Sequence, residues 1–249
     1  MKFYGDLTWK QVTQSLDHRI LFIPCGSLEQ HGPHLPLNVD TVITEEIAKR
    51  IASTCGGIVA PAINYGAISL PGSGGGYGFP GNIHIRGELL IEIYYDIIHS
   101  FLKNGARRLV IINGHWENYS FLIEAIEKLR EENKLEGKKL CSLSWWDVVN
   151  SEEMIGIFGE FFGWHTEHAG QAETALMMYY HSEKVLLNER VDTDHIHPEN
   201  IYGYPIPEDW SSENGNLCNT THVTYQMGEQ LAKVIEARLN ELVEKLMKE

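Results

Sequence analysis

Long apolar runs, clustered basic residues and paired cysteines are all missing from this 249-residue chain. No stretch of about 18 consecutive apolar residues occurs, which argues against a transmembrane helix. Residues 1–6 have no apolar run of the kind that signal peptides carry. The four cysteines form no CxxC pair, so neither a zinc ribbon nor a thioredoxin-type motif is supported. We therefore expect a cytoplasmic protein with reduced cysteines and no membrane partner.

Basic side chains are few compared with acidic ones, 20 Lys and Arg against 34 Asp and Glu, which gives a formal net charge of −14. Nucleic-acid binding needs clustered Lys and Arg, so we expect no nucleic-acid partner. Apolar content of 43% and charged content of 22% are ordinary for a globular protein. The length suits one large α/β domain, which we expect to span residues 1–249.

Short apolar runs alternate with longer amphipathic segments along the chain. Strands are predicted at residues 20–25, 58–63, 108–113 and 140–145. Helices are predicted at about residues 41–55, 89–102, 120–132 and 172–180, and from residue 225 onward. This alternation predicts a single α/β domain with a mainly parallel sheet flanked by helices. Residues 183–222 are turn-rich, as an extended excursion or an interface arm would be, and we interpret His195 and His197 as surface or interface residues.

A loop rich in Gly and Pro follows the first predicted strand and carries Glu29, His31, His34 and Asp40. Glu29 and His31 are two residues apart, so in extended backbone they project to the same side. Asp40 alone could be the N-cap of the next helix. The set of Glu29, His31 and Asp40 is not what a plain connector needs, and carboxylates with imidazoles are typical ligands of divalent metals.

A second polar cluster, His115 and Glu117, follows the third predicted strand at the same two-residue spacing. Because the carboxyl ends of parallel strands meet at one edge of a sheet, we expect the two clusters to face the same crevice. The predicted ligands are Glu29, His31, Asp40, His115 and Glu117. They offer two imidazoles and three carboxylates, too many carboxylates for a structural zinc site. They fit a two-metal catalytic centre with one bridging carboxylate, for Zn²⁺ or Mn²⁺.

A third polar stretch, residues 163–173, contains His168, which could act as a general acid or base because imidazole titrates near neutral pH. It could also be only a polar loop that caps the following helix. Glu167 and Glu173 could each orient a neighbouring histidine or metal ligand. Glu173 could equally lie in the first turn of that helix and complement its dipole.

The Gly-rich loop at residues 72–81 lacks the Gly-Lys-Ser/Thr of a phosphate-binding loop. We interpret it as a loop that covers substrate, with Ser73 as a polar contact. Trp116, Trp146 and Trp164 fall near the predicted metal cluster in the sequence. Most tryptophans are core residues, but these could also form an aromatic box around a small planar substrate.

Three segments resemble motifs of the creatininase (creatinine amidohydrolase) family. They are the stretch from Gly26 to Thr41, the segment Asn113-Gly-His-Trp-Glu-Asn118, and the segment Trp164-x-x-Glu-His-Ala-Gly-x-x-Glu-Thr174. The resemblance implies a single α/β domain with two divalent metal ions, Zn or Mn, per subunit. It also implies hydrolysis of the C–N bond of a small amide and assembly as a homohexamer.

Carried over by position, the resemblance assigns Glu29 and His115 to one metal and His31 and Glu117 to the other. Asp40 would bridge both metals.

The resemblance also implies a set of substrate contacts around a catalytic pair. Glu117 and His168 would be catalytic, with His168 as the proton shuttle. The substrate-contact positions are Ser73, Trp116, Trp146, Trp164 and, directly after the last tryptophan, His165. In this mechanism, two metals activate a bridging water that attacks a carbonyl carbon, and His168 protonates the leaving nitrogen.

His165 marks a departure from creatininase itself, which has an aspartate at this position. An acid there would pair with a guanidinium-like substrate, and a histidine does so poorly. We expect hydrolysis of creatinine to creatine. The alternative is a related amidohydrolase acting on a formamide or another small amide, such as a deformylase. A non-catalytic metal-bound ligand sensor is disfavoured, because a sensor does not need open metal positions.

Overall fold

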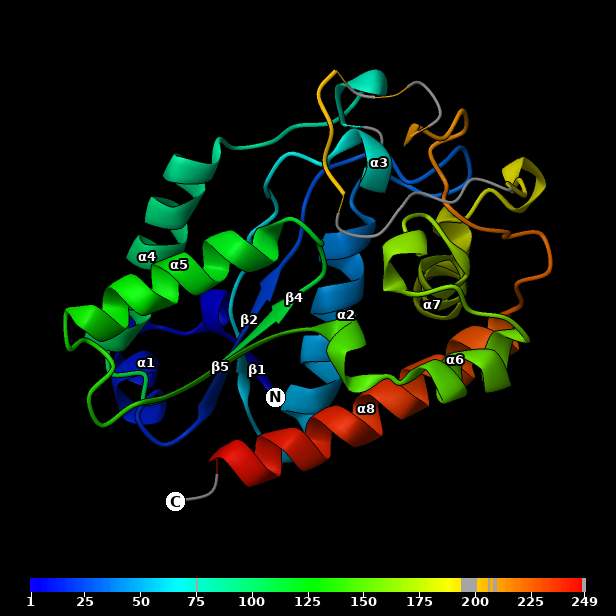
Figure 1. Cartoon of the computed structure of the whole chain (residues 1–249). Coiled ribbons are helices and arrows are strands. Elements are labelled where there is room, and N and C mark those ends of the chain that lie inside the picture. Colours follow the sequence, from blue (N-terminus) through cyan, green and yellow to red (C-terminus); the bar gives the residue numbers. More distant parts are fainter. Residues whose placement is uncertain (75, 194–200, 206, 208–209, 248–249) are drawn as a thin grey trace.

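The computed structural model describes residues 1–74, 76–193, 201–205, 207 and 210–247. They fold around one sheet of parallel strands in the order β1-β3-β2-β4-β5. The strands are β1 (Lys2–Phe3), β2 (Ile20–Cys25), β3 (Ile58–Val59), β4 (Arg108–Asn113) and β5 (Lys139–Ser144). Figure 1 shows them in the centre with helices on either side, which confirms the predicted α/β fold.

The apolar runs of β2 and β4 are buried on both faces of the sheet. Leu21 and Ile23 pack into one hydrophobic core, whereas Phe22 between them packs into the other. Val110 and Ile111 of β4 divide between the two cores in the same way. A strand that is covered on both faces has no polar face, which is why these two strands appear in the sequence as continuous apolar runs.

Two groups of helices cover the sheet (Figure 1). The first core is built from α2 (Val39–Cys55), α6 (Ser151–Phe158), α7 (Gln171–His181) and α8 (Tyr225–Met247). The second is built mainly from α4 (Gly87–Lys103) and α5 (Asn118–Glu131), and the end of α1 (Trp9–Ser15) packs against it. A short helix, α3 (Pro71–Gly74), lies in the Gly-rich loop. Among the described residues, no helix is long and apolar enough to cross a membrane.

The predicted strand at residues 58–63 is shorter in the structure, because only Ile58 and Val59 form a regular ladder. Pro61 has no N–H to donate, so a regular ladder cannot continue through it. The chain still follows β2 beyond this point, since the Ile63 N–H donates to the Pro24 carbonyl at 3.0 Å. The two-residue β1 and the short helix α6 were not predicted.

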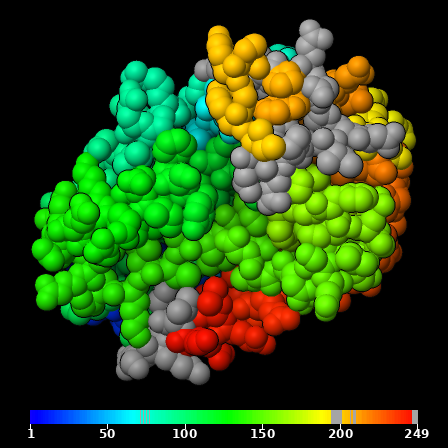
Figure 2. Space-filling model, viewed as in Figure 1, coloured from blue at the N-terminus to red at the C-terminus, as the bar shows by residue number. Residues whose placement is uncertain are grey.

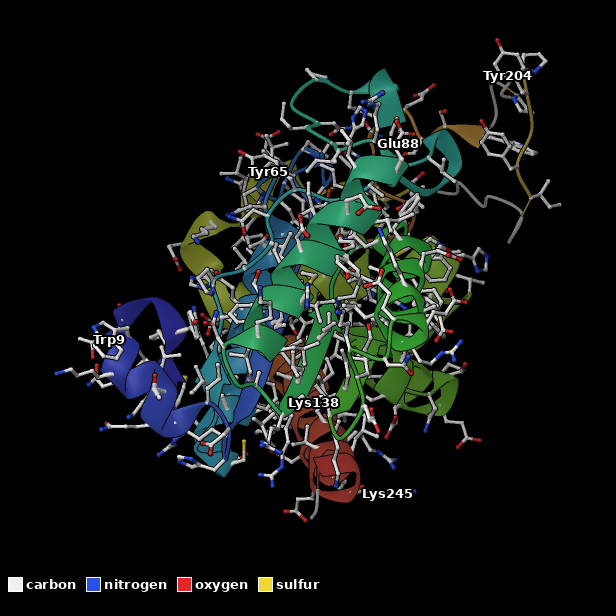
Figure 3. All side chains as sticks on the ribbon, turned by 90° about the vertical axis from the view of Figure 1, so that its left-hand side faces the viewer. Trp9, Tyr65, Glu88, Lys138, Tyr204 and Lys245 are labelled. Carbon is white, nitrogen blue, oxygen red and sulfur yellow. The ribbon has the colours of Figure 1, made fainter. Side chains whose placement is uncertain are left out.

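The strand register places the carboxyl ends of β2, β4 and β5 in one row. Cys25 pairs with Asn113, and Asn113 pairs with Ser144. The loops that follow these three strands therefore begin side by side, as predicted for the first two. In Figure 3, Lys138, which precedes β5, lies toward the end of the molecule opposite to Tyr204.

We expect Gly228→Ala to lower the free energy of unfolding by about 1–3 kcal/mol, because it overpacks the contact between α7 and α8. A Cβ atom at Gly228 would collide with the carbonyl oxygen of Ala175 and lie 2.9 Å from Cβ of Tyr179. Gly156→Ala in α6 is the matched control, since a Cβ atom there meets nothing within 4 Å. That change should be neutral or stabilising by up to about 1 kcal/mol. Urea unfolding of both variants measures the difference, and equal effects would contradict close packing at Gly228.

Candidate metal centre and cavity

Four of the five predicted ligands meet beyond the carboxyl ends of β2 and β4. Glu29 and His31 come from the loop after β2, Asp40 from the first turn of α2 and His115 from the loop after β4. Each of the four is 3% exposed or less. The N-cap of α2 is Asn38 rather than Asp40. The Asp40 side chain is therefore not needed as a cap and is available to the site.

Two glycines allow α2 to begin against the strand ends. A Cβ atom at Gly26 would lie 2.6 Å from Cα of Thr41, and one at Gly114 would lie 2.6 Å from the carbonyl oxygen of Asp40. Real Cβ atoms essentially never come this close to other heavy atoms. The absence of a side chain at both positions therefore lets the first turn of α2 carry Asp40 in between the two strand loops.

Two of the three groups of described residues that could hold a metal share Asp40. In the first, Nδ1 of His115 lies 2.8 Å from Oε1 of Glu29 and 3.3 Å from Oδ2 of Asp40. In the second, Nε2 of His31 lies 3.0 Å from Oδ1 of Asp40 and 3.7 Å from Oε2 of Glu173. The ligand atoms within each group are close enough together to hold one metal ion. The two oxygens of Asp40 face different groups, which is the geometry of a bridging carboxylate.

The outer nitrogen of each imidazole is held by a backbone carbonyl. Nε2 of His115 lies 3.0 Å from the carbonyl oxygen of Ala67, and Nδ1 of His31 lies 3.1 Å from that of Glu29. A carbonyl oxygen only accepts, so these nitrogens carry hydrogen and donate. The inward nitrogens are then the ones that can bind a metal, and a backbone acceptor of this kind is usual behind metal-binding histidines.

Two buried carboxylate oxygens in the site, Oε2 of Glu29 and Oδ2 of Asp40, accept no hydrogen bond from any described residue. Buried polar atoms are normally hydrogen-bonded, and a buried charge without a partner is costly. A divalent cation between these oxygens would satisfy both of them. The donor set of this site therefore fits a metal.

The pKa values show how strongly the site attracts positive charge. Burial alone would lower the pKa of His31, but Asp40 and Glu173 raise it to about 10. Burial also opposes the charge on His115, yet Glu29 and its other acidic neighbours raise the pKa of His115 well above its usual value. Burial raises the pKa of Glu173 to about 8. Without a metal, the cluster therefore takes up protons to offset its carboxylates.

The structure differs from the expected pairing of Glu117 with His31. Glu117 faces the outer nitrogen of His115, with Oε2 3.4 Å from Nε2, and its Oε1 accepts from the Leu70 N–H at 3.0 Å. Glu117 is absent from the groups of described residues that could hold a metal. Glu173, in the first turn of α7, faces His31 in its place and is held by the Ala169 N–H at 2.7 Å.

The other two histidines of the sequence motifs lie beside this cluster. His168 has its Nδ1 3.8 Å from Oε1 of Glu29, and its ring centroid lies 4.6 Å from that of His31. Together with Glu29 and His31 it forms the third group that could hold a metal. Burial lowers the pKa of His168 to about 4, so its ring is neutral near pH 7. His34 is fully buried, and its Nε2 lies 2.8 Å from Oγ1 of Thr174. Among the described residues, no group that could hold a metal includes His34.

A cavity of about 310 Å³ lies next to the metal groups and has aromatic walls. Trp116 and Trp146 stack with their planes 17° apart, and Trp145 meets both Trp146 and Trp164 edge-on. The predicted residues that line the cavity are Glu29, Asp40, His115, Trp116, Glu117, Trp146, Trp164, His165 and His168. The side chain of Ser73 lies outside the described part of the structure, as do His195 and His197.

Part of the cavity wall comes from a segment for which no contact was predicted. Ile201, Tyr202, Gly203 and Trp210 all line the cavity, although they lie far along the chain from the metal groups. Figure 2 shows the gold-coloured segment around residues 201–205 at the upper surface of the molecule. The sequence feature that could have predicted this contact is the presence of two aromatic residues, Tyr202 and Trp210, in a turn-rich stretch.

Carboxylates and imidazoles arranged around a shared aspartate, at the carboxyl edge of a parallel sheet, form the framework of a metal-dependent hydrolase. The chain belongs to the creatininase family, because the family model described as creatinine amidohydrolase matches residues 5–243. It is thus a creatininase-family amidohydrolase, an enzyme class that acts on C–N amide bonds.

Comparison with individual proteins agrees with this membership. The chain is 35% identical to creatinine amidohydrolase of Pseudomonas putida, over 93% of this chain and 92% of that protein. It is also 32% identical to a mycofactocin precursor peptide peptidase of Mycolicibacterium smegmatis, over 69% of this chain and 62% of that protein. A crystal structure of creatinine amidohydrolase superposes with a TM-score of 0.92 at 32% identity, covering 98% of this chain and 96% of the other.

Three further solved creatininases are described as an Mn form, a Zn-Zn type mutant and a mutant complexed with creatine. They are 32% or 33% identical to this chain, with a TM-score of 0.91 and coverage of 98% of this chain and 97% of theirs.

We expect the affinity of the site for Zn²⁺ or Mn²⁺ to rise with pH between about 6 and 9. Although burial opposes it, Asp40 and Glu173 raise the pKa of His31 to about 10, so its inward nitrogen is protonated throughout this range in the metal-free protein. A metal must displace that proton, and this displacement becomes easier as the pH rises. Calorimetric titration in buffers of different ionisation enthalpy measures both the affinity and the protons released. A pH-independent affinity without proton release would contradict this electrostatic picture.

Proposed function

We propose that this protein opens creatinine to creatine by hydrolysis of its cyclic amide C–N bond, using two divalent metal ions, Zn or Mn. The observation that carries the proposal is the sharing of Asp40 between two carboxylate–imidazole groups at the wall of an aromatic cavity. The identity of 35% to a creatinine amidohydrolase, over 93% of this chain, supports the same substrate.

In this proposal, Glu29 and His115 would hold one metal, His31 and Glu173 would hold the other, and Asp40 would be available to both. When bound, the two ions would lower the pKa of a water and polarise the carbonyl oxygen of the substrate.

The protein's own side chains then place the substrate and stabilise its leaving group. The tryptophan walls hold a small planar ring by stacking and by excluding water. His168, beside Glu29 at the cavity, donates a hydrogen bond to the leaving nitrogen, which takes its proton from the attacking water. Glu117 orients His115 from behind and lines the cavity, where it can hold a polar group of the substrate.

A second candidate substrate is a formamide or another small amide, and the observation that favours it is His165. This residue lines the cavity where an acid would pair with the guanidinium-like part of creatinine. An imidazole offers a weaker partner for such a cation and accepts a wider range of polar groups.

We expect the metal content of two acid-to-amide variants to separate the two metal groups. Purified wild-type protein should contain about two metal ions per chain, Glu173→Gln about one, and Asp40→Asn almost none, because Asp40 belongs both to the group with Glu29 and His115 and to the group with His31 and Glu173. Elemental analysis after dialysis gives the counts. Glu45→Gln, on the same helix as Asp40 but paired with Lys49, is the control and should keep both ions. If Glu117→Gln lost one ion and Glu173→Gln lost none, Glu117 would be the ligand instead.

We expect Zn²⁺- or Mn²⁺-loaded protein to convert creatinine to creatine, and Asp40→Asn to lower this activity to background while the fold is kept. Asp40 lies at the metal groups, outside the two hydrophobic cores, so thermal unfolding of the variant should stay cooperative. Creatine formation is measured directly by chromatography. No turnover of creatinine, together with release of formate from a formamide, would favour the second candidate substrate.

We also propose that the protein is a cytoplasmic homohexamer, as the family resemblance implies. Size-exclusion chromatography with light scattering measures the mass of the assembly, and the mass of a monomer would exclude the hexamer.

A further inference from the structure

Gln30 lies between two metal-group residues in the sequence, but its side chain contacts His168. It is buried, with 5% of its surface exposed. Its Nε2 lies 2.9 Å from Nε2 of His168, 2.7 Å from the carbonyl oxygen of Gly74 and 2.9 Å from that of Gly215. Its Oε1 accepts from the Gly32 N–H at 2.8 Å. The amide thus joins four segments of the chain at one point.

Backbone groups determine which way round this amide lies. The Gly32 N–H only donates, so it requires the oxygen of Gln30, and the two glycine carbonyls only accept, so they require the nitrogen. If the amide were reversed, its oxygen would face both carbonyls and its nitrogen would face the Gly32 N–H. All three contacts would then be repulsive or lost. The amide nitrogen therefore points at His168.

The facing nitrogen of His168 must consequently be an acceptor. An amide nitrogen has two hydrogens and no usable lone pair, so a hydrogen on Nε2 of His168 would set two donors against each other. The two amide hydrogens face three acceptors, namely two glycine carbonyls and Nε2 of His168, so one hydrogen is shared between two acceptors. The hydrogen of the neutral imidazole then resides on Nδ1, the nitrogen 3.8 Å from Oε1 of Glu29.

We propose that Gln30 is a positioning residue that fixes the orientation and the tautomer of His168, so that His168 presents an Nδ1–H donor to the substrate. The mention of substrate rests on the function proposed above, whereas the tautomer follows from the contacts alone. A neutral imidazole held as a donor can stabilise charge that develops on a carbonyl oxygen or a leaving nitrogen. Gln30 belongs to none of the groups that could hold a metal, so it supplies that state without being a ligand.

The surroundings leave His168 and Gln30 little freedom to rearrange. A Cβ atom at Gly215 would collide with the Gln30 amide, and one at Gly74 would lie 3.1 Å from Cε1 of His168. The carbonyl oxygen of His168 accepts from the Leu217 N–H at 3.0 Å. Close packing on both sides therefore keeps the His168 ring and the Gln30 amide in fixed positions relative to each other.

The tautomer can be tested by neutron diffraction from deuterated crystals of the Zn²⁺-loaded protein. We expect deuterium on Nδ1 of His168, none on Nε2, and an amide deuterium of Gln30 directed at Nε2. In Gln30→Glu, a carboxylate oxygen replaces the amide nitrogen and can accept, so the deuterium should move to Nε2. Deuterium on Nε2 in the wild-type protein would overturn the proposal, whether or not the protein acts on creatinine.

The consequence for catalysis is tested by kinetics on creatinine. We expect Gln30→Glu and Gln30→Met to lower kcat by about 100-fold, the usual cost of losing one hydrogen-bond donor to the developing charge, with little change in KM. Gln30→Met removes the hydrogen bonds without adding a charge, and serves if the glutamate variant does not fold.

Asn82→Asp is the matched control, because Asn82 binds the same loop without touching His168. Its Oδ1 accepts from the Gln30 N–H at 2.6 Å, and its Nδ2 donates to the carbonyl of Gly76. We expect this variant to leave the His168 deuterium on Nδ1 and kcat within about tenfold of wild type. If Asn82→Asp and the Gln30 variants lowered kcat equally and all kept deuterium on Nδ1, Gln30 would be only a loop anchor. If wild-type protein did not act on creatinine, the proposed function would fail, and the neutron result would still decide the role of Gln30.

Discussion

The whole site depends on the close approach of the first turn of α2 to the carboxyl ends of β2 and β4. Glycine at positions 26 and 114 permits that approach, since any side chain at either position would strike α2. The approach delivers Asp40 between imidazoles that come from two different strand loops. Those loops begin at the same edge of the sheet, because Cys25, Asn113 and Ser144 lie side by side at the ends of their strands. A rigid sheet therefore sets the spacing of the ligands.

That geometry concentrates negative charge where water cannot screen it. Glu29 and Glu173 are buried and each has an oxygen within 4.8 Å of an oxygen of Asp40, and the metal-free protein offsets these acids by protonating His31 and His115. A buried ion cluster of this kind stabilises the fold poorly by itself. The cluster is instead suited to binding a cation, because a divalent ion can replace a proton, satisfy the carboxylate oxygens that accept no hydrogen bond, and hold the loops together.

The sequence predicted the parts of the fold and site that depend on local pattern. β2 and β4 were evident as continuous apolar runs, because both of their faces are buried. α4, α5 and α8 were evident because each repeats the helical period over many residues. β1 was missed and β3 was predicted too long, because a strand of two residues is too short to show a pattern in the sequence. The ligands in loops directly after strands were predicted for the same local reason.

The metal-facing position of Glu173 and the contacts of Gln30 could not be predicted in this way. Glu173 faces His31 only because α7 packs beside α2, and the partners of the Gln30 amide at Gly74 and Gly215 lie 44 and 185 residues away.

The residues that could bind metal and the residues that line the rest of the cavity come from different parts of the chain. The metal groups come from strand and helix ends, whereas much of the cavity wall comes from Trp146, Trp164, Trp210 and residues 201–203, none of which contributes a ligand. A wall residue can therefore change, as His165 illustrates, without disturbing the buried charges that bind the metals. Different substrates then become compatible with one unaltered centre.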